Sequence, residues 1–184
     1  PREPLVTADP SASDPSLTLF VMNYDEIRVK LYAVTTDDWE DYMGYLRDFD
    51  ETDEDEEFPT PPGELVMDEM LAVDAAEDLL TETAVSLQPA LDGETGHVIA
   101  VIQPPTLARD FWERRRQYIQ TWVQVTQIGL DAFADHSQLV TWTTDLADGS
   151  PLSDVTISSS NGQSAQPDAN GLAEFNLSNN GLLY

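Results

Sequence analysis

The amino-acid sequence predicts a mainly β protein with two antiparallel β-sandwich domains, the first carrying a short inserted helix. Three observations predict this fold class. Apolar and polar residues alternate with a period of two along several runs, as they do in half-buried strands. Asn-Gly and Asp-Gly turns separate short β-rich runs, which is typical of antiparallel sheets. One segment changes to the 3.6-residue period of an amphipathic helix.

The composition bounds the kinds of partner that the chain can bind. Hydrophobic residues make up 41% of the 184 residues, enough to build a packed core. The sequence holds 35 acidic residues against 8 Lys and Arg, a net charge of −27. Nucleic acid is therefore excluded as a partner, because phosphate binding needs clustered bases. Anionic membranes would repel the chain for the same reason. It contains no cysteine, and we expect no cofactor.

The sequence shows no targeting or membrane-spanning segment. A basic region followed by an apolar stretch, which marks a signal peptide, is missing at the start. No run of 18 apolar residues could span a membrane. Because the chain begins with Pro1 rather than Met, we interpret it as an excised segment that a signal could have preceded.

The first domain is expected over residues 17–104, after a Pro- and Ser-rich linker over 1–16. Residues 27–34, IRVKLYAV, alternate between apolar and polar side chains and predict a strand. Further strands are expected at 17–22, 81–87 and 97–103. A helix is predicted over 36–49, because its apolar residues follow at steps of three and four: Trp39, Tyr42, Met43, Leu46 and Phe49.

The segment 48–57 reads DFDETDEDEE and is expected to be a solvated loop, because like charges this dense repel one another. A calcium site is the alternative, since hard cations prefer carboxylate ligands. The spacing matches no ordered calcium loop, however, and the glycine that would fold one is missing. We therefore predict that residues 50–57 bind no calcium.

Residues 105–117 are expected to connect the two domains. They hold half of the basic residues of the chain beside two aromatic residues: Arg109, Arg114, Arg115 and Arg116 with Phe111 and Trp112. Such a patch is typical of nucleic-acid binding. Given the net charge, we interpret it instead as a surface connection whose arginines meet acidic residues of the same molecule.

The second domain is expected over residues 118–184. An alternating run at 119–125 would open it, followed by strands at 128–132 and 139–146 and by turns at 148–151, 161–162, 167–171 and 179–181. The segment has room for about five or six strands, whereas a complete sandwich of this type has ~7. We therefore expect the domain to be truncated at its C-terminus. The free edge beside strand 172–177 would recruit other strands or the 1–16 tail.

No residue pattern indicates catalysis. The chain has two histidines, His97 and His136. Asp135, His136 and Ser137 supply the residue types of a catalytic triad, but neighbours in one turn do not adopt the geometry that a triad needs. His97 heads a predicted strand and is interpreted as structural. We predict that the chain is not an enzyme and holds no catalytic, cofactor-binding or metal-binding residue.

Three motifs in the second half resemble a macroglobulin-like domain of bacterial alpha-2-macroglobulins. They are VTQIGL at 125–130, DLADGSPL at 145–152 and PDANGLAEF at 167–175, where Pro167 replaces the usual threonine. The strand VKLYAV at 29–34, followed by Trp39, is similar to a strand of the preceding domain in that family. The resemblance is good over 118–177 and looser over 17–104.

The resemblance implies a scaffold fragment from the N-terminal half of a large secreted or periplasmic protease trap, a broad-spectrum endopeptidase inhibitor. In that family a protease cuts a bait region, the molecule rearranges, and a thioester often couples to the attacker. The thioester pattern C-x-E-Q needs a cysteine, so that chemistry lies outside this chain. The implied partners are other domains of the same parent chain, and target proteases through the full-length protein.

An Ig-like cell-surface adhesin, or another extracellular binding repeat, is the alternative function. It would predict tandem repeats of nearly identical sequence, and the two halves of this chain are not that similar.

Overall fold

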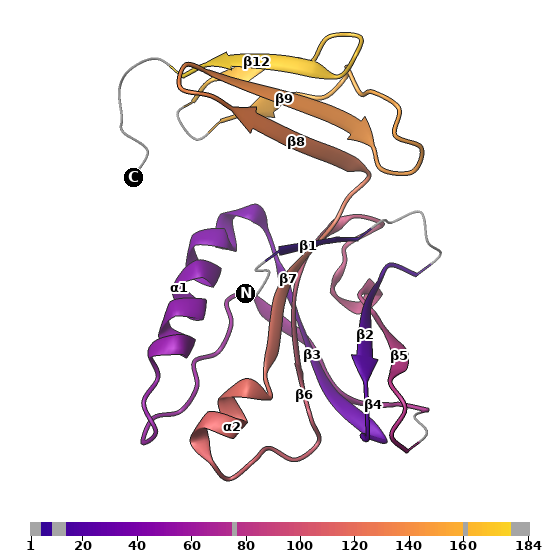
Figure 1. The fold of residues 1–184 in the computed structure, drawn as a ribbon, viewed down its shortest axis with the longest axis vertical. Helices are drawn as coiled ribbons and strands as arrows, with labels where there is room; N and C mark the ends of the chain where they lie inside the picture. The colour runs from indigo at the N-terminus through magenta and orange to yellow at the C-terminus, as the bar shows by residue number, and fades with distance from the viewer. Residues whose placement is uncertain (1–4, 9–13, 75–76, 160–161, 178–184) are drawn as a thin grey trace. The chain divides into compact units, whose positions relative to one another are not determined.

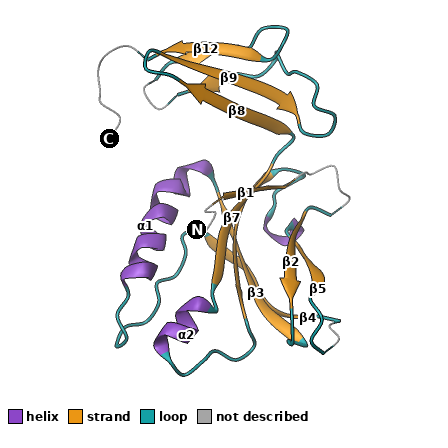
Figure 2. Cartoon of the chain, in the orientation of Figure 1, coloured by secondary structure: helices purple, strands orange, loops and turns teal. Residues whose placement is uncertain are grey.

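The chain is mainly β in its computed structural model, as the sequence predicts (Figures 1 and 2). The structure describes residues 5–8, 14–74, 77–159 and 162–177. Two compact units divide the chain at Val125: residues 1–125 and residues 126–184. None of the described helices is both long and apolar enough to cross a membrane.

The first unit is built on a five-stranded sheet with the order β1-β7-β6-β3-β4 (Figure 1). Its strands are β1 (Leu5–Ala8), β3 (Glu26–Val34), β4 (Glu64–Ala72), β6 (Gly96–Gln103) and β7 (Ile119–Val125). All neighbours pair antiparallel except β1, which runs parallel to β7. A second, two-stranded sheet pairs β2 (Ser16–Val21) with β5 (Thr81–Ser86), and a short 3₁₀ turn, η2 (Gln88–Ala90), follows β5.

The central strands of the five-stranded sheet, β3, β6 and β7, are buried on both faces. Alternate residues of its central strands, such as Val29, Val98 and Val123, pack toward β2 and β5 in a purely apolar cluster. The residues between them, such as Ile99 and Trp122, join an aromatic cluster with α1 (Trp39–Glu51). The first unit therefore has three layers: helix, large sheet and small sheet (Figure 2).

The predicted helix over 36–49 is confirmed and consists of a 3₁₀ turn, η1 (Thr36–Asp38), followed by α1. At its start the Thr35 N–H donates to the Asp38 carboxylate at 2.8 Å. The apolar stripe differs in one position from the expectation. Tyr45 is buried, whereas Met43 is 37% exposed, because the face toward the sheet is set by Tyr42, Tyr45 and Phe49.

An alternating strand at 119–125 is expected from the sequence to open the second domain, but in the structure it belongs to the first unit. β7 pairs with β6 over seven residues and with β1 on its other side. Its alternation predicts a strand but does not name the partner strand. The expected linker over 1–16 likewise contains β1 and the first residue of β2, and the expected connection 105–117 contains a short helix, α2 (Phe111–Arg116).

The second unit contains a three-stranded antiparallel sheet with the order β12-β9-β8 (Figure 1). Its strands are β8 (Ile128–Ala134), β9 (Gln138–Asp145) and β12 (Leu172–Asn176), and a short pair joins β10 (Ile157–Ser158) to β11 (Ser164–Ala165). Within the described residues, β12 is an edge strand, as expected, but the early strand β1 pairs with β7 rather than with it. The predicted turn at 179–181 and the run that follows lie outside the described residues.

Candidate functional site

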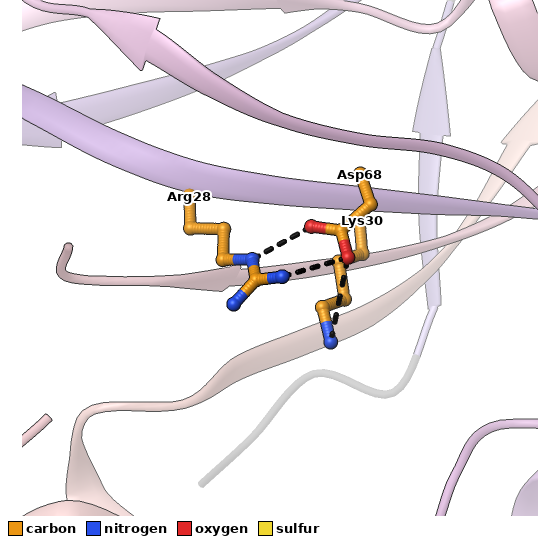
Figure 3. Close-up of polar contacts among 3 residues, drawn as sticks. All are labelled: Arg28, Lys30 and Asp68. Atoms are coloured by element: carbon orange, nitrogen blue, oxygen red, sulfur yellow. Dashed lines mark hydrogen bonds and ion pairs between the residues drawn. The ribbon is translucent and has the colours of Figure 1, made fainter. Parts of the chain in front are cut away.

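A charged cluster joins β3 to the edge strand β4 (Figure 3). Arg28 donates from Nε to Asp68 Oδ1 at 2.6 Å and from Nη2 to Oδ2 at 2.8 Å, and the Lys30 ammonium lies 3.9 Å from the same carboxylate. The Arg28 guanidinium holds the pKa of Asp68 below its usual value. Because the Arg28 side chain is 42% exposed, solvent screens the pair and its contribution to stability is small. The cluster places charge on an edge strand, which discourages unwanted strand pairing.

The acidic stretch 48–57 is not entirely a loop, because α1 continues to Glu51. The buried Phe49 anchors this last turn, and the Thr52 hydroxyl donates to the Asp48 carbonyl at 2.7 Å. The Arg115 guanidinium donates through Nη2 to the Thr52 carbonyl. The positive charge of Arg115 interacts favourably with the negative, C-terminal end of the helix dipole. It also compensates the acidic side chains of this stretch, which are unfavourable at that end.

No group of three or more His, Cys, Asp or Glu side chains among the described residues is placed to hold one metal ion. The absence of calcium binding at residues 50–57 stays a prediction.

Two of the three arginines of α2, Arg114 and Arg115, contact aromatic rings rather than acidic side chains. Arg114 lies 5.7 Å from the Phe111 ring centroid and Arg115 lies 5.0 Å from the same ring. None of the ion pairs within the described part of the chain involves either arginine. Arg114 and Arg115 therefore do not pair with acidic residues of the same molecule, as expected from the sequence, but lie over aromatic rings. This contact suits the planar and weakly hydrated guanidinium group.

His97 belongs to the aromatic cluster under α1. Trp122 Nε1–H donates to His97 Nδ1 at 3.1 Å, so the imidazole accepts at this nitrogen. Burial lowers the pKa of His97 from its ordinary value. The Trp122 ring also lies 5.3 Å from the Trp39 ring and 5.4 Å from the Tyr42 ring, between centroids. The surroundings of His97 are those of a packing residue.

The triad-like sequence Asp135-His136-Ser137 forms the turn between β8 and β9. Asp135 Oδ1 accepts the Ser137 N–H at 2.7 Å and the Gln138 N–H at 2.8 Å, and the Ser137 hydroxyl lies 3.1 Å away. These backbone hydrogen bonds lower the pKa of Asp135. The carboxylate therefore organises the turn, as in other Asx turns.

The second and third resemblance motifs meet at Thr143, which is 1% exposed. The Thr143 N–H donates to the Gly171 carbonyl at 2.8 Å, and its hydroxyl donates to the Leu152 carbonyl at 2.7 Å. In return, the Leu152 N–H donates to the Thr143 carbonyl at 3.0 Å. Thr143 is predicted from the sequence only as part of its strand. The signal that could have found it is a threonine on a β-rich run flanked by both turns.

The turn at 167–171 is held by Asp168. Its Oδ1 accepts the Asn170 N–H at 2.8 Å and the Leu172 N–H at 3.0 Å, and these bonds lower the pKa of the carboxyl. Gly171 has a φ of +80°, and a Cβ there would lie 2.3 Å from the Thr143 carbonyl oxygen. This glycine is therefore required by both its backbone conformation and its close approach to β9.

Comparison with solved structures identifies similar folds in one protein of Escherichia coli. A crystal structure of its native alpha-2-macroglobulin spanning domains MG0-NIE-MG1 aligns with 88% of this chain at 18% identity, with a TM-score of 0.55. A fragment spanning domains NIE-MG1 aligns with 88% of the chain at 17% identity and a TM-score of 0.56. The trypsin-activated protein aligns with 92% of the chain at 14% identity and a TM-score of 0.58.

The chain spans 51% of the first of these structures, 78% of the second and 12% of the third. Neither a protein-family model nor a curated protein sequence matches it. With identities of 14% to 18%, the likeness concerns the fold. At that level, the resemblance to alpha-2-macroglobulin domains inferred from the sequence motifs is confirmed.

Proposed function

We propose that this chain is a scaffold segment of a bacterial alpha-2-macroglobulin-type protease inhibitor, and that it performs no catalysis itself. The observation that carries the proposal is the extent of the structural likeness, which takes in 88% to 92% of the chain. The fragment spanning domains NIE-MG1 is covered over 78% of its length. We assign the two units of this chain to those two domains, in that order.

The use of polar side chains supports a structural role. Asp135 and Asp168 accept backbone N–H groups in turns, and Thr143 joins two loops through buried hydrogen bonds. Arg115 caps a helix. Such bonds to backbone rigidify a scaffold, whereas a hydrolase needs a nucleophile within reach of a base.

The proposed function implies where the protein acts and which partners it meets. A protease inhibitor of this kind acts outside the cytoplasm, in the periplasm, at the cell envelope or in the medium. Its scaffold domains contact other domains of the same parent chain, and proteases are met through the full-length protein. The charge of −27 fits a role without nucleic acid or anionic membrane as partner.

A repeat-type adhesin is less well supported by the architecture. An array of repeats is built from equivalent units. Here the first unit has helices on one face of a five-stranded sheet, and the second unit has a three-stranded sheet with no helix within its described residues.

The test is made on the longer protein that the proposal requires. After incubation with trypsin, hydrolysis of a large protein substrate should slow, because the protease is enclosed. Hydrolysis of a small chromogenic peptide should continue, since a small substrate still reaches the enclosed protease.

The 184-residue chain alone serves as the control and should slow neither reaction. Slowing of several unrelated proteases by the chain alone would contradict a pure scaffold role. A longer protein that leaves trypsin fully active on large substrates would contradict the inhibitor assignment.

A further inference from the structure

The three-stranded sheet of the second unit is covered on one face by β10 and β11. There Ala173 and Phe175 of β12 are buried with Ile157 of β10. Because side chains alternate along a strand, the residues between them lie on the other face. We call it the tryptophan face. It is defined by two rows of residues across β8, β9 and β12: Asp131, Trp142 and Leu172 in one row, and Phe133, Val140 and Glu174 in the next.

The tryptophan face exposes large apolar side chains. Phe133 is 63% exposed, and Trp142 and Leu172 are each 41% exposed. Residues of one row lie directly opposite one another on paired strands, with Cβ atoms about 5 Å apart. Together with the half-buried Val140 they therefore form one contiguous group. Single exposed apolar residues are ordinary, but a contiguous group marks a binding surface.

The ring of Trp142 is held in place on this face. Its Nε1–H donates to the Asn170 carbonyl at 3.2 Å. Asn170 belongs to the turn in which Asp168 accepts backbone N–H groups. The indole therefore presents its exposed surface in one orientation. Among aromatic rings, an indole binds a Lys or Arg cation most strongly over its face.

Two carboxylates without a partner flank the apolar group. Asp131 lies directly opposite Trp142, and Glu174 lies opposite Val140. Both residues are exposed, and neither carboxylate forms a hydrogen bond or an ion pair with another described residue.

The whole second unit carries acidic charge. Residues 126–184 contain no Lys or Arg. Their acidic residues are Asp131, Asp135, Asp145, Asp148, Asp154, Asp168 and Glu174. Complementary charge therefore favours a positively charged partner on the tryptophan face.

The undescribed residues of the second unit are joined to other parts of the sheet. Residues 160–161 connect β10 to β11, which pack on the opposite face. Residues 178–184 follow Leu177, whose N–H donates to the Ser137 carbonyl in the turn between β8 and β9. That turn lies at the end of the sheet away from the row of Trp142 and Leu172.

We propose that the tryptophan face binds a segment of a partner protein that carries Arg or Lys among apolar side chains. One cation lies over the Trp142 ring and pairs with Asp131, and a second pairs with Glu174. Apolar side chains of the segment contact Phe133 and Leu172. A second copy of this chain is disfavoured, because each copy has a net charge of −27. This inference is independent of the proposed function.

The test uses nuclear magnetic resonance on the ¹⁵N-labelled 184-residue chain. The probe is a blocked seven-residue peptide in which leucine alternates with arginine, and its twin carries serine in place of leucine. The leucine peptide should shift the indole N–H signal of Trp142 and the amide signals of Asp131, Phe133 and Glu174 in a saturable manner. The serine twin has the same charge but lacks the apolar contacts, so it should bind at least about fivefold more weakly.

Two variants identify the contact. Trp142→Leu keeps an apolar side chain but removes the ring, and should weaken binding of the leucine peptide about two- to fivefold. Asp131→Asn should weaken it by a similar factor, as expected for an exposed ion pair. Each variant's amide spectrum verifies its fold, and Asp131→Asn tests the proposal by itself if Trp142→Leu does not fold.

Two matched controls should bind like the parent. Trp112→Leu removes an exposed tryptophan of the first unit, and Asp154→Asn removes an exposed carboxylate of the second unit outside the tryptophan face. Equal binding of the two peptides, or equal weakening by the controls, would reduce the binding to general attraction by the acidic chain and overturn the proposal. Self-association that Trp142→Leu abolishes would assign the face to a second copy instead. Binding that emerges only after removal of residues 178–184 would assign it to the chain's own end.

Discussion

The two units of the molecule bury their sheets in different ways. In the first unit, β7 has five buried residues and lies between an apolar layer on one side and an aromatic layer on the other. In the second unit, no residue of β8 is buried, and Leu130 and Phe133 are 56% and 63% exposed. The same two-residue alternation of side chains therefore supports a three-layer core in one place and a thin, partly covered sheet in the other.

The difference teaches where each unit obtains its stability. The first unit rests on hydrophobic burial, which grows with the number of packed layers. The second unit has three buried apolar residues in its cluster: Ile157, Ala173 and Phe175. It depends more on the hydrogen bonds that join its loops at Thr143. We therefore expect the second unit to unfold at a lower urea concentration than the first.

Replacing Trp122 should have the largest effect on the difference in stability between the two units. Trp122 is 2% exposed and touches Trp39, Tyr42 and His97. Trp122→Ala should lower the free energy of unfolding of the first unit by about 3–5 kcal/mol. Urea titration followed by near-ultraviolet circular dichroism measures this loss. The amide signals of the second unit should remain in place, and their collapse would show that the units are not separate.

Gly171 tests the second unit through its backbone. Gly171→Ala should cost about 2–3 kcal/mol, because an Ala is strained at positive φ and its Cβ meets the Thr143 carbonyl. Gly149→Ala is the matched control, since Gly149 has a φ of +74° but open space around the added Cβ. The control should cost about 1 kcal/mol. If thermal unfolding showed the same loss of stability for Gly171→Ala and Gly149→Ala, the close approach of Gly171 to β9 would contribute nothing to the cost.

Thr143 tests the second unit through its hydrogen bonds. Thr143→Val keeps the shape of the side chain but removes the hydroxyl that donates to the Leu152 carbonyl. The expected loss is about 1–2 kcal/mol. Thr121→Val in the first unit is the control. The Thr121 hydroxyl donates only a long hydrogen bond, 3.3 Å, to the carbonyl of the adjacent Trp122, so its removal should cost less. A larger loss for the control than for Thr143→Val would contradict the assigned role of the loop junction.

Replacing His97 should have the smallest effect on stability, and this effect should depend on pH. Burial lowers its pKa below the ordinary value of 6.5, so the unfolded chain binds the proton more readily than the folded one. The stabilisation is present above about pH 6.5 and is lost as the pH falls toward the folded-state pKa. His97→Gln keeps an acceptor for Trp122 and should flatten this part of the stability profile.

Local features of the fold were predictable because they depend on neighbouring residues. The helix at 36–49 follows from the change of period after Thr35, and the strand at 27–34 from its alternation. The turns at 148–151 and 167–171 follow from their Asp, Asn and Gly residues.

Long-range pairing was not predictable from those patterns. β7 alternates like any half-buried strand, and nothing local shows that it joins β6 and β1 rather than β8. Arg115 reaches Thr52 across 63 residues of sequence, and Thr143 links two loops that are separate in the chain. Each of these features comes from tertiary packing, which overrides local preference.

The parallel pairing of β1 with β7 has a mechanical consequence. Leu5 lies beside Trp122 and Ala8 beside Val125, where the chain leaves for the second unit. Tension between Leu5 and Thr126 would pull the two strands along their length in opposite directions, so all hydrogen bonds of the ladder would carry the load together. The β8–β9 hairpin instead has its two chain ends side by side at Ile128 and Asp145, and would open one bond at a time. Under force, where the unfolding rate governs survival, the first unit should act as a clamp and the hairpin as a zipper.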